Sequence, residues 1–243
     1  VHAPMLYSPS EVIGNFRDCE NKIMITTVYF WRTKAVFIPL AIIFMAINKI
    51  QLKRLSSITF IKLLGTGKGE SFTPKDADPF RWGMLLTISE NQIDVVDNSF
   101  VVKSWRKICT SEYRVILKPI SSHGFWSSKQ PFSVDKFEWN GKIAAVTRAR
   151  IVWRKNLVFW RAVPPVTESL HQSPGLINAI GIGEAPIGLQ GTFSIWKDAA
   201  SLRDFAYKGQ AHSEAIRATS ANRWYSEELF ARFAVIEERG MLA

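Results

Sequence analysis

The sequence predicts an α+β fold of two fused ferredoxin-like repeats, each a split βαβ unit, that together form a dimeric α+β barrel. Two observations predict it. Similar segments recur roughly 120 residues apart along the 243 residues of the chain. In addition, the apolar pattern of each half indicates the order strand, helix, strand, strand, helix, strand. Sheets of two such units can pack together while helices cover their other faces.

The matched segments occur in the same order in both halves. The pairs are the β-branched runs from Lys22 and Lys142, the glycine motifs at Gly65 and Gly181, the strand patterns Met84–Ser89 and Thr192–Lys197, and the closing strands from Tyr113 and Ala231. They predict an N-terminal arm at residues 1–21, a first repeat at 22–120, a linker at 121–141 and a second repeat at 142–243.

Helices of the second half have recognisable ends. Asn156 is a suitable N-cap for a helix that reaches Trp160 and is broken by Pro164-Pro165. A second helix is expected from Thr167 to Pro174. Asp198 can cap a helix over Ala199–Tyr207, and Ala211–Ser220 is a further helical run.

Composition limits the class of protein. Hydrophobic residues make up 47% of the chain, which is enough for a packed core. The cysteines Cys19 and Cys109 are far apart, which excludes a cysteine-based zinc cage and fits a reducing cytoplasm. We therefore expect a cytoplasmic location.

The net charge of +10 favours anionic partners. A basic cluster interleaved with aromatic residues is compatible with nucleic acid; it consists of Arg148, Arg150, Arg154, Lys155 and Arg161 with Trp153, Phe159 and Trp160. No nucleic-acid-binding motif accompanies it, so we expect no nucleic-acid partner.

One uncharged run, Ala35 to Ile47, contains 13 residues. A membrane span needs about 20 apolar residues, and shorter runs usually form core helices. We expect a core helix here, with peripheral membrane contact as the alternative.

Motifs for phosphate binding, metalloprotease or serine hydrolase chemistry are absent from the sequence. The segment GTGKGE at Gly65 lacks the ending of a phosphate loop and predicts a turn between strands. Among the histidines, His212 lies on a predicted helix with Ala211 and Ala215 nearby, which leaves room for a flat group. From the residues alone, a core histidine and a ligand both remain open.

The strand over Leu189–Trp196 alternates polar and apolar side chains. Gln190, Thr192 and Ser194 fall on one face, where they either meet solvent or offer hydrogen-bond donors to a ligand.

Several segments in this order resemble the spheroidene monooxygenase family over about residues 22–238. They are HSEAIR from His212, WYSEELFARF from Trp224, GIGEAPIGLQGTFSIWKDAASLRDFA from Gly181, LLGTGKGESFTP from Leu63, VILKPIS with FWSSKQPF around Trp126, and AAVTRARI from Ala144. This is a carotenoid ketolase family. Its members resemble haem proteins of the dimeric α+β barrel class, which includes aldoxime dehydratases, dye-decolorising peroxidases and chlorite dismutases.

The resemblance implies a haem-dependent monooxygenase that inserts oxygen from O2 into an apolar substrate such as a carotenoid. It implies one haem b, whose iron His212 would ligate, and an external electron donor such as ferredoxin. The second repeat would bind the haem in a slot walled by Phe193, Ile195, Phe205, Ile216 and Trp224. Arg217 would lie near the propionates, or would be an exposed helix arginine.

On the other side of the haem, the resemblance leaves four candidate donors to bound O2, which are Arg148, Gln190, Thr192 and Ser194. For Arg148 a structural salt bridge is an equal alternative. Two other functions remain open on the same fold: a haem-dependent dehydratase that resembles aldoxime dehydratase, and a non-catalytic haem-binding protein.

Overall fold

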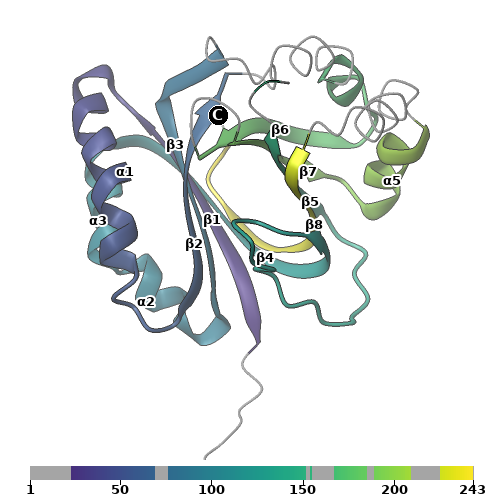
Figure 1. Ribbon diagram of the computed structural model, residues 1–243, viewed down its shortest axis with the longest axis horizontal. Coiled ribbons are helices and arrows are strands. Elements are labelled where there is room, and N and C mark those ends of the chain that lie inside the picture. The colour runs from purple at the N-terminus through teal and green to yellow at the C-terminus, as the bar shows by residue number, and fades with distance from the viewer. Residues whose placement is uncertain are drawn as a thin grey trace, which may run out of the picture.

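The computed structural model describes residues 23–68, 76–151, 154, 167–184, 189–208 and 225–242. Within these ranges, eight strands form a closed antiparallel barrel in the order β1-β3-β2-β6-β7-β5-β8-β4 (Figure 1). The strands are β1 (Met24–Thr33), β2 (Ile58–Gly67), β3 (Ala77–Ser89), β4 (Cys109–Gly124), β5 (Ile143–Ile151), β6 (Leu176–Gly183), β7 (Leu189–Trp196) and β8 (Tyr225–Arg239). The predicted α+β class is confirmed.

The helices lie outside the barrel (Figure 1). They are η1 (Ala35–Phe37), α1 (Ile38–Leu52), η3 (Glu90–Gln92), α2 (Ile93–Asp97), α3 (Phe100–Ile108) and α5 (Ala199–Lys208). Residues 167–171 are also helical. The predicted helix after Asp198 is confirmed, and the Asp198 carboxylate accepts a hydrogen bond of 2.7 Å from the backbone N–H of Ser201.

The two halves contribute equal blocks of strands. The first half supplies the order β4-β1-β3-β2 and the second supplies β8-β5-β7-β6. The blocks join through β4 with β8 and through β2 with β6, where Gly65 pairs with Gly183. The glycines predicted to form turns therefore lie at the ends of β2 and β6, at a junction between the halves.

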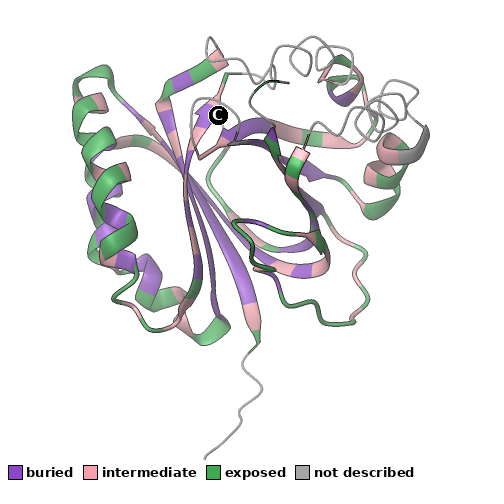
Figure 2. Ribbon diagram, in the orientation of Figure 1, coloured by how far each residue is buried: buried purple, intermediate pink, exposed green. Residues whose placement is uncertain are grey.

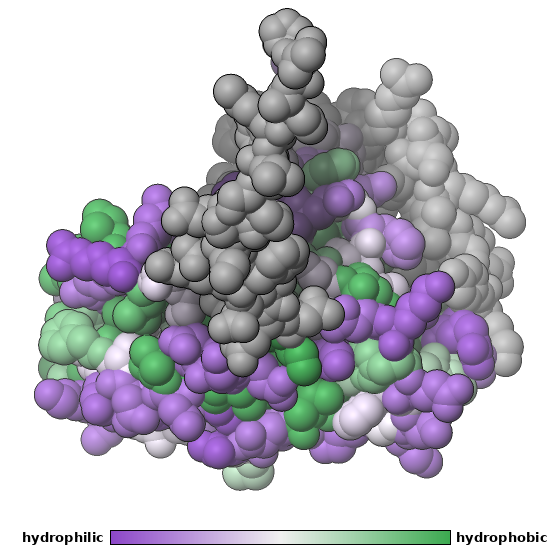
Figure 3. All heavy atoms as spheres, turned by 90° about the horizontal axis from the view of Figure 1, so that it is seen from below, coloured by the Kyte–Doolittle hydropathy of each residue, from purple (hydrophilic) through white to green (hydrophobic). Residues whose placement is uncertain are grey.

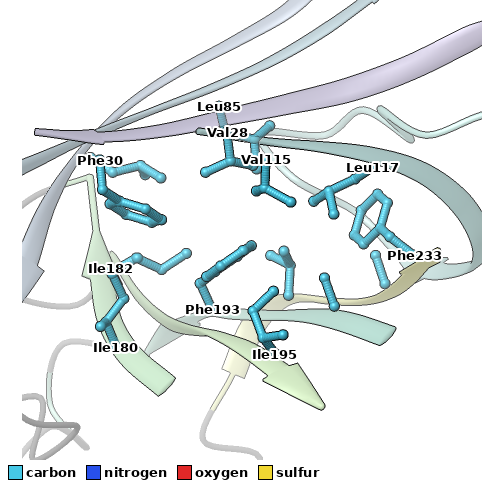
Figure 4. Packing of buried hydrophobic residues seen from close by; sticks show 14 of the residues in the cluster. Val28, Phe30, Leu85, Val115, Leu117, Ile180, Ile182, Phe193, Ile195 and Phe233 are labelled. Atoms are coloured by element: carbon cyan, nitrogen blue, oxygen red, sulfur yellow. The ribbon is translucent and has the colours of Figure 1, made fainter. Parts of the chain in front are cut away.

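Alternate residues of each strand point into the barrel, and most of these inward residues are apolar. Aromatic and aliphatic side chains of β1 and β4 face those of β6 and β7 across the interior (Figure 4). Phe30 and Phe193 meet there, with ring centroids 5.4 Å apart. Packing of this kind fills the barrel with side chains.

Large side chains cover the outer face of the first half, beneath α1 and α3. Trp31 of β1 stacks on Trp105 of α3 with ring centroids 5.1 Å apart. The hydroxyl group of Tyr29 donates a 2.7 Å hydrogen bond to Asp97, which also pairs with Arg114 at 2.8 Å. Together with the helices, this face forms a second hydrophobic core outside the barrel.

The expectation of a core helix at 35–47 is wrong. Only three residues of α1 are buried, namely Ala41, Asn48 and Leu52. The side of α1 turned away from the sheet is exposed along the helix (Figure 2). The cause is the position of α1, which packs on the outside of the barrel and has no further element over it among the described residues.

The predicted boundaries of the linker, the N-terminal arm and two helices can be compared with the described residues. Strand β4 runs to Gly124, so the linker predicted at 121–141 begins inside this strand. The N-terminal arm at 1–21 and the predicted helices at 156–160 and 211–220 lie outside the described residues. The division into two repeats at the linker stays a prediction.

Candidate functional site

The outer face of the second half differs from that of the first, because small side chains line it. Thr147 of β5 lies opposite Thr192 of β7, and Ala145 lies opposite Ser194. Ala149 lies opposite Gln190, and Gly181 of β6 pairs with Thr192 on its other side. We call the face formed by Ala145, Thr147, Ala149, Gly181, Gln190, Thr192 and Ser194 the shallow face.

The corresponding face of β1 and β3 shows what the shallow face lacks. There Tyr29 lies opposite Met84 and Trp31 lies opposite Trp82. Tyr29, Trp31 and Met84 are fully buried beneath the helices. Where the first half carries aromatic and long side chains, the second carries alanine, glycine and hydroxyl groups. At these positions the sheet of the second half therefore carries shorter side chains than the sheet of the first half.

One end of the shallow face is closed by aromatic packing. Trp196 of β7 stacks on Phe205 of α5, with ring centroids 5.3 Å apart. The indole N–H of Trp196 donates a 2.9 Å hydrogen bond to the Ser194 hydroxyl. Ser194 therefore supports this packing, whereas the Thr192 hydroxyl has no hydrogen-bond partner among the described residues and is partly exposed.

The structure does not bring all the predicted slot residues together. Phe193 and Ile195 point into the barrel interior (Figure 4). Phe205 packs on the opposite side of β7, over Trp196. These three cannot wall one slot, because successive residues of a strand face opposite sides of the sheet. The predicted alternation of Gln190, Thr192 and Ser194 holds, and these residues belong to the shallow face.

Arg148 lies on the inner side of β5, behind the shallow face. Its side chain is 2% exposed and binds two carboxylates. Nη2 lies 3.3 Å from Oε1 of Glu184, and Nη1 donates to Oε1 of Glu227. Because its charged group is turned toward the interior, Arg148 has the structural salt-bridge role that the sequence left open. It does not join Thr192 and Ser194.

The two carboxylates have further donors. Glu184 accepts a 2.6 Å hydrogen bond from the indole N–H of Trp126 and a hydrogen bond from Lys62 Nζ. Glu227 accepts from the backbone N–H groups of Ser127 at 3.0 Å and Ser128 at 2.6 Å. We call Lys62, Trp126, Arg148, Glu184 and Glu227 the barrel-end cluster.

The backbone around Trp126 is shaped to bring these donors to Glu227. Ser127 and Ser128 have positive φ angles of 55° and 58°, and Gly124 has a φ of 89°. A Cβ atom at Gly124 would lie 2.2 Å from the carbonyl oxygen of Glu228, so only glycine fits there. Trp126 is fully buried. The indole of Trp126 therefore belongs to the interior and not to an exposed surface.

The surroundings favour the charged forms of the two carboxylates in the barrel-end cluster. Burial would raise the pKa of Glu184, but hydrogen bonds from Lys62 and Trp126 and the nearby positive charges outweigh it and lower the pKa. Burial also raises the pKa of Glu227, but the backbone N–H groups of Ser128 and Ser127 and the charge of Arg148 outweigh this effect. The pKa of Glu227 is therefore lowered as well. Burial lowers the pKa of Lys62, against the effect of Glu184.

Sequence reasoning missed four members of this cluster, namely Lys62, Trp126, Glu184 and Glu227. Trp126 and Glu184 stand in segments that carry the family resemblance, FWSSKQPF and GIGEAP. Lys62 and Glu184 are 122 positions apart, so local pattern could not pair them.

Four predicted haem-binding residues, His212, Ile216, Arg217 and Trp224, lie outside the described residues. The segment that holds them joins α5, which ends at Lys208, to β8, which begins at Tyr225. Tyr225 pairs with Ile151 at the end of β5. Both flanking elements, α5 and β8, therefore belong to the half that carries the shallow face.

Described residues enclose little empty space. A hollow between the ends of β1, β3 and β4 and the chain near Leu242 has a cavity volume of about 10 Å³, which is about one water molecule. Within the same described ranges no group of three or more His, Cys, Asp or Glu side chains is placed to hold a metal ion. The described part of the barrel interior thus leaves no room for a ligand as large as a haem.

Comparison with known proteins gives close relatives. Spheroidene monooxygenase of Cereibacter sphaeroides is 36% identical over 196 residues, which cover 79% of this chain and 60% of that protein. The enzyme of the same name from Rhodobacter capsulatus is 36% identical over 75% of this chain and 78% of its own length. That of Rubrivivax gelatinosus is 31% identical over 75% and 70%. The chain thus spans less than two thirds of the first relative. No protein-family model matches the chain.

Solved structures show the same fold. A crystal structure of aldoxime dehydratase has a TM-score of 0.55 and 9% sequence identity, over 90% of this chain and 83% of its own. A second, the aldoxime dehydratase OxdRE in complex with butyraldoxime, has a TM-score of 0.54 and covers 88% and 79%. At such low identity the likeness concerns the fold alone. By its sequence relatives, the chain belongs to the spheroidene monooxygenase family.

Proposed function

We propose that the protein is a haem-dependent monooxygenase that inserts oxygen from O2 into an extended apolar substrate of the carotenoid class. Family membership supports the reaction and the substrate class. The observation that carries the proposed haem site is the shallow face, where small side chains replace the aromatic layer of the first half.

The residue types of the shallow face support a haem site in this proposal. A flat macrocycle needs a bed without bulky side chains, and Ala145, Ala149 and Gly181 provide one. When bound, the haem supplies O2 binding and activation. His212 would hold the iron, and Arg217 would bind a propionate. In this proposal the Thr192 hydroxyl group would donate a hydrogen bond toward bound O2, because that hydroxyl has no other partner among the described residues.

The barrel-end cluster has a positioning role in this proposal. Arg148 ties the ends of β5, β6 and β8 together through Glu184 and Glu227. Buried and satisfied polar networks hold one arrangement of the backbone. Arg148 thereby keeps the sheet beneath Gln190 and Thr192 in register, without touching the substrate.

The remaining parts of the proposal concern fold and electron supply. We infer that each half is a ferredoxin-like repeat, since both halves contribute strands in the same order. The net charge of +10 suits an acidic electron donor such as a ferredoxin.

Absorption spectroscopy after haem supplementation tests the site. We expect a Soret band at about one haem per chain, and ferrous–CO features that are lost or shifted in His212→Ala. Thr192→Trp should abolish the Soret band, because an indole would occupy the shallow face. Thr59→Trp places the same ring at an exposed position on β2 and should leave haem binding unchanged. A wild-type protein without a Soret band, or a Thr192→Trp variant with a normal one, would overturn the assignment.

Oxygen consumption separates the monooxygenase from its rivals. A monooxygenase consumes O2 in proportion to product, whereas a dehydratase resembling aldoxime dehydratase requires none. Haem loading without turnover of a carotenoid in the presence of a reductant would favour a non-catalytic haem-binding protein. The experiment is an oxygen-electrode assay with the haem-loaded protein, a reducing system and a dispersed carotenoid.

A further inference from the structure

Helix α1 presents an apolar surface to the outside of the molecule. Residues 35–52 form a helix that is long and apolar enough, by length and composition, to cross a membrane. Only 17% of this segment is buried in the protein, so most of it is not covered. The exposed aliphatic side chains are Val36 (74%), Leu40 (36%), Ile42 (55%), Ile43 (52%), Ile47 (39%) and Ile50 (62%). Surface helices of globular proteins normally place polar residues on this side. A continuous run of exposed aliphatic side chains along one helix is typical of an interaction site.

The opposite side of α1 is fixed to the barrel. The side-chain oxygen of Asn48 accepts a 2.9 Å hydrogen bond from the buried indole N–H of Trp105. Phe44 packs edge-on against the same ring, with centroids 5.3 Å apart. A polar residue in a run of aliphatic ones thus decides which side faces inward. Because α1 is held flat on the protein by these contacts, it is placed to lie on a membrane surface rather than to cross it.

Charge at the edges of the helix indicates what covers it. Between residues 34 and 54 the sequence contains Lys34, Lys49, Lys53 and Arg54 and no acidic residue. All four are exposed. In Figure 3 hydrophobic side chains reach the surface between hydrophilic ones at the left of the molecule, the side on which α1 and α3 lie in Figure 1. An aliphatic patch bordered by cationic residues is the pattern of a helix in the interface of an anionic bilayer.

A second copy of the chain fits this surface less well. A two-fold dimer through α1 would place the same basic residues of both copies near one another, which is unfavourable. The exposed patch on α1 is aliphatic, whereas cores of protein interfaces are enriched in aromatic residues and arginine.

We propose that the outer side of η1 and α1 docks the protein on an anionic lipid bilayer, with the aliphatic side chains among the acyl chains and the lysines at the headgroups. This inference goes beyond the proposed function, since it uses no feature of the shallow face or of the haem. It places the protein where an apolar substrate is dissolved.

Vesicle flotation tests the docking. The chain of residues 1–243 is mixed with vesicles of phosphatidylcholine alone, or with vesicles that contain three parts in ten of phosphatidylglycerol. We expect at least ten-fold more protein to float with the anionic vesicles. The double variant Ile43→Glu/Ile50→Glu should lose at least ten-fold of this binding. The matched control Ile177→Glu/Ile236→Glu changes two similarly exposed isoleucines on β6 and β8, 49% and 45% exposed, and should float as the wild type does.

A second pair of variants tests the charge. Lys49→Gln/Lys53→Gln should reduce the difference between anionic and neutral vesicles, with unchanged circular dichroism and urea midpoint. Docking is disproved if the wild type stays unbound, or if Ile43→Glu/Ile50→Glu floats normally. It is equally disproved if the wild type is a lipid-free dimer that this variant converts to a monomer and neither floats, because α1 then meets a second copy. A failed haem titration would leave the flotation result unaffected.

Discussion

Replacing Arg148 by methionine should destabilise the protein severely. The arginine side chain is 2% exposed, and its loss leaves Glu184 and Glu227 without a shared cation in the interior. Breaking a buried ion pair by removing one partner costs about 3–5 kcal/mol. Both carboxylates keep other donors, from Trp126, Lys62 and the backbone near Ser127, so the low end applies. We expect a loss of about 3 kcal/mol in the free energy of unfolding.

Urea unfolding followed by tryptophan fluorescence measures this loss of free energy. In a separate thermal unfolding experiment, a change of 3 kcal/mol corresponds to a fall in Tm of about 6–12 °C for a chain of this size. Arg150→Met removes an exposed arginine from the same strand and should cost no more than about 0.5 kcal/mol. If Arg148→Met costs less than about 1 kcal/mol, or no more than Arg150→Met, the barrel-end cluster does not hold the strand ends as argued.

Three further predictions concern stability. Glu184 has a pKa below its ordinary value in the folded state, so it contributes stability that is present above its unfolded pKa of about 4.3 and is lost as the pH falls through the folded value. Urea midpoints from pH 7 to pH 3 should therefore fall more steeply below about pH 4.3 for the wild type than for Glu184→Gln; parallel profiles would contradict this. Asn48→Ala should lower the free energy of unfolding by about 1–3 kcal/mol, because it leaves the buried indole N–H of Trp105 without an acceptor, and thermal unfolding would show it. In Gly191→Ala the new Cβ would lie 2.1 Å from a carbonyl oxygen of β5, so calorimetry should show a loss above about 1 kcal/mol. Gly65→Ala, whose Cβ would lie 3.7 Å from the nearest backbone oxygen, should be close to neutral, and an equal loss in both variants would refute the steric argument.

Part of this protein is determined by local sequence. Strand patterns with a period of two residues, the N-cap at Asp198 and the repeated order of segments predict the class of the fold. The alternation along β7 also separates Gln190, Thr192 and Ser194 from Phe193. These features depend on residues close together in the chain, so they can be predicted without coordinates. Family membership was likewise indicated by segments such as GIGEAP and AAVTRARI.

Tertiary structure alone decides which side of each element is used. Arg148 is 36 positions from Glu184 and 79 from Glu227, and only closure of the barrel brings the three together. The run at 35–47 is apolar on all sides, so its pattern predicts burial. The bond from Trp105 to Asn48 nevertheless holds one side inward and leaves the other exposed. Pairings between distant segments depend on the register and packing of whole strands, which no local pattern specifies.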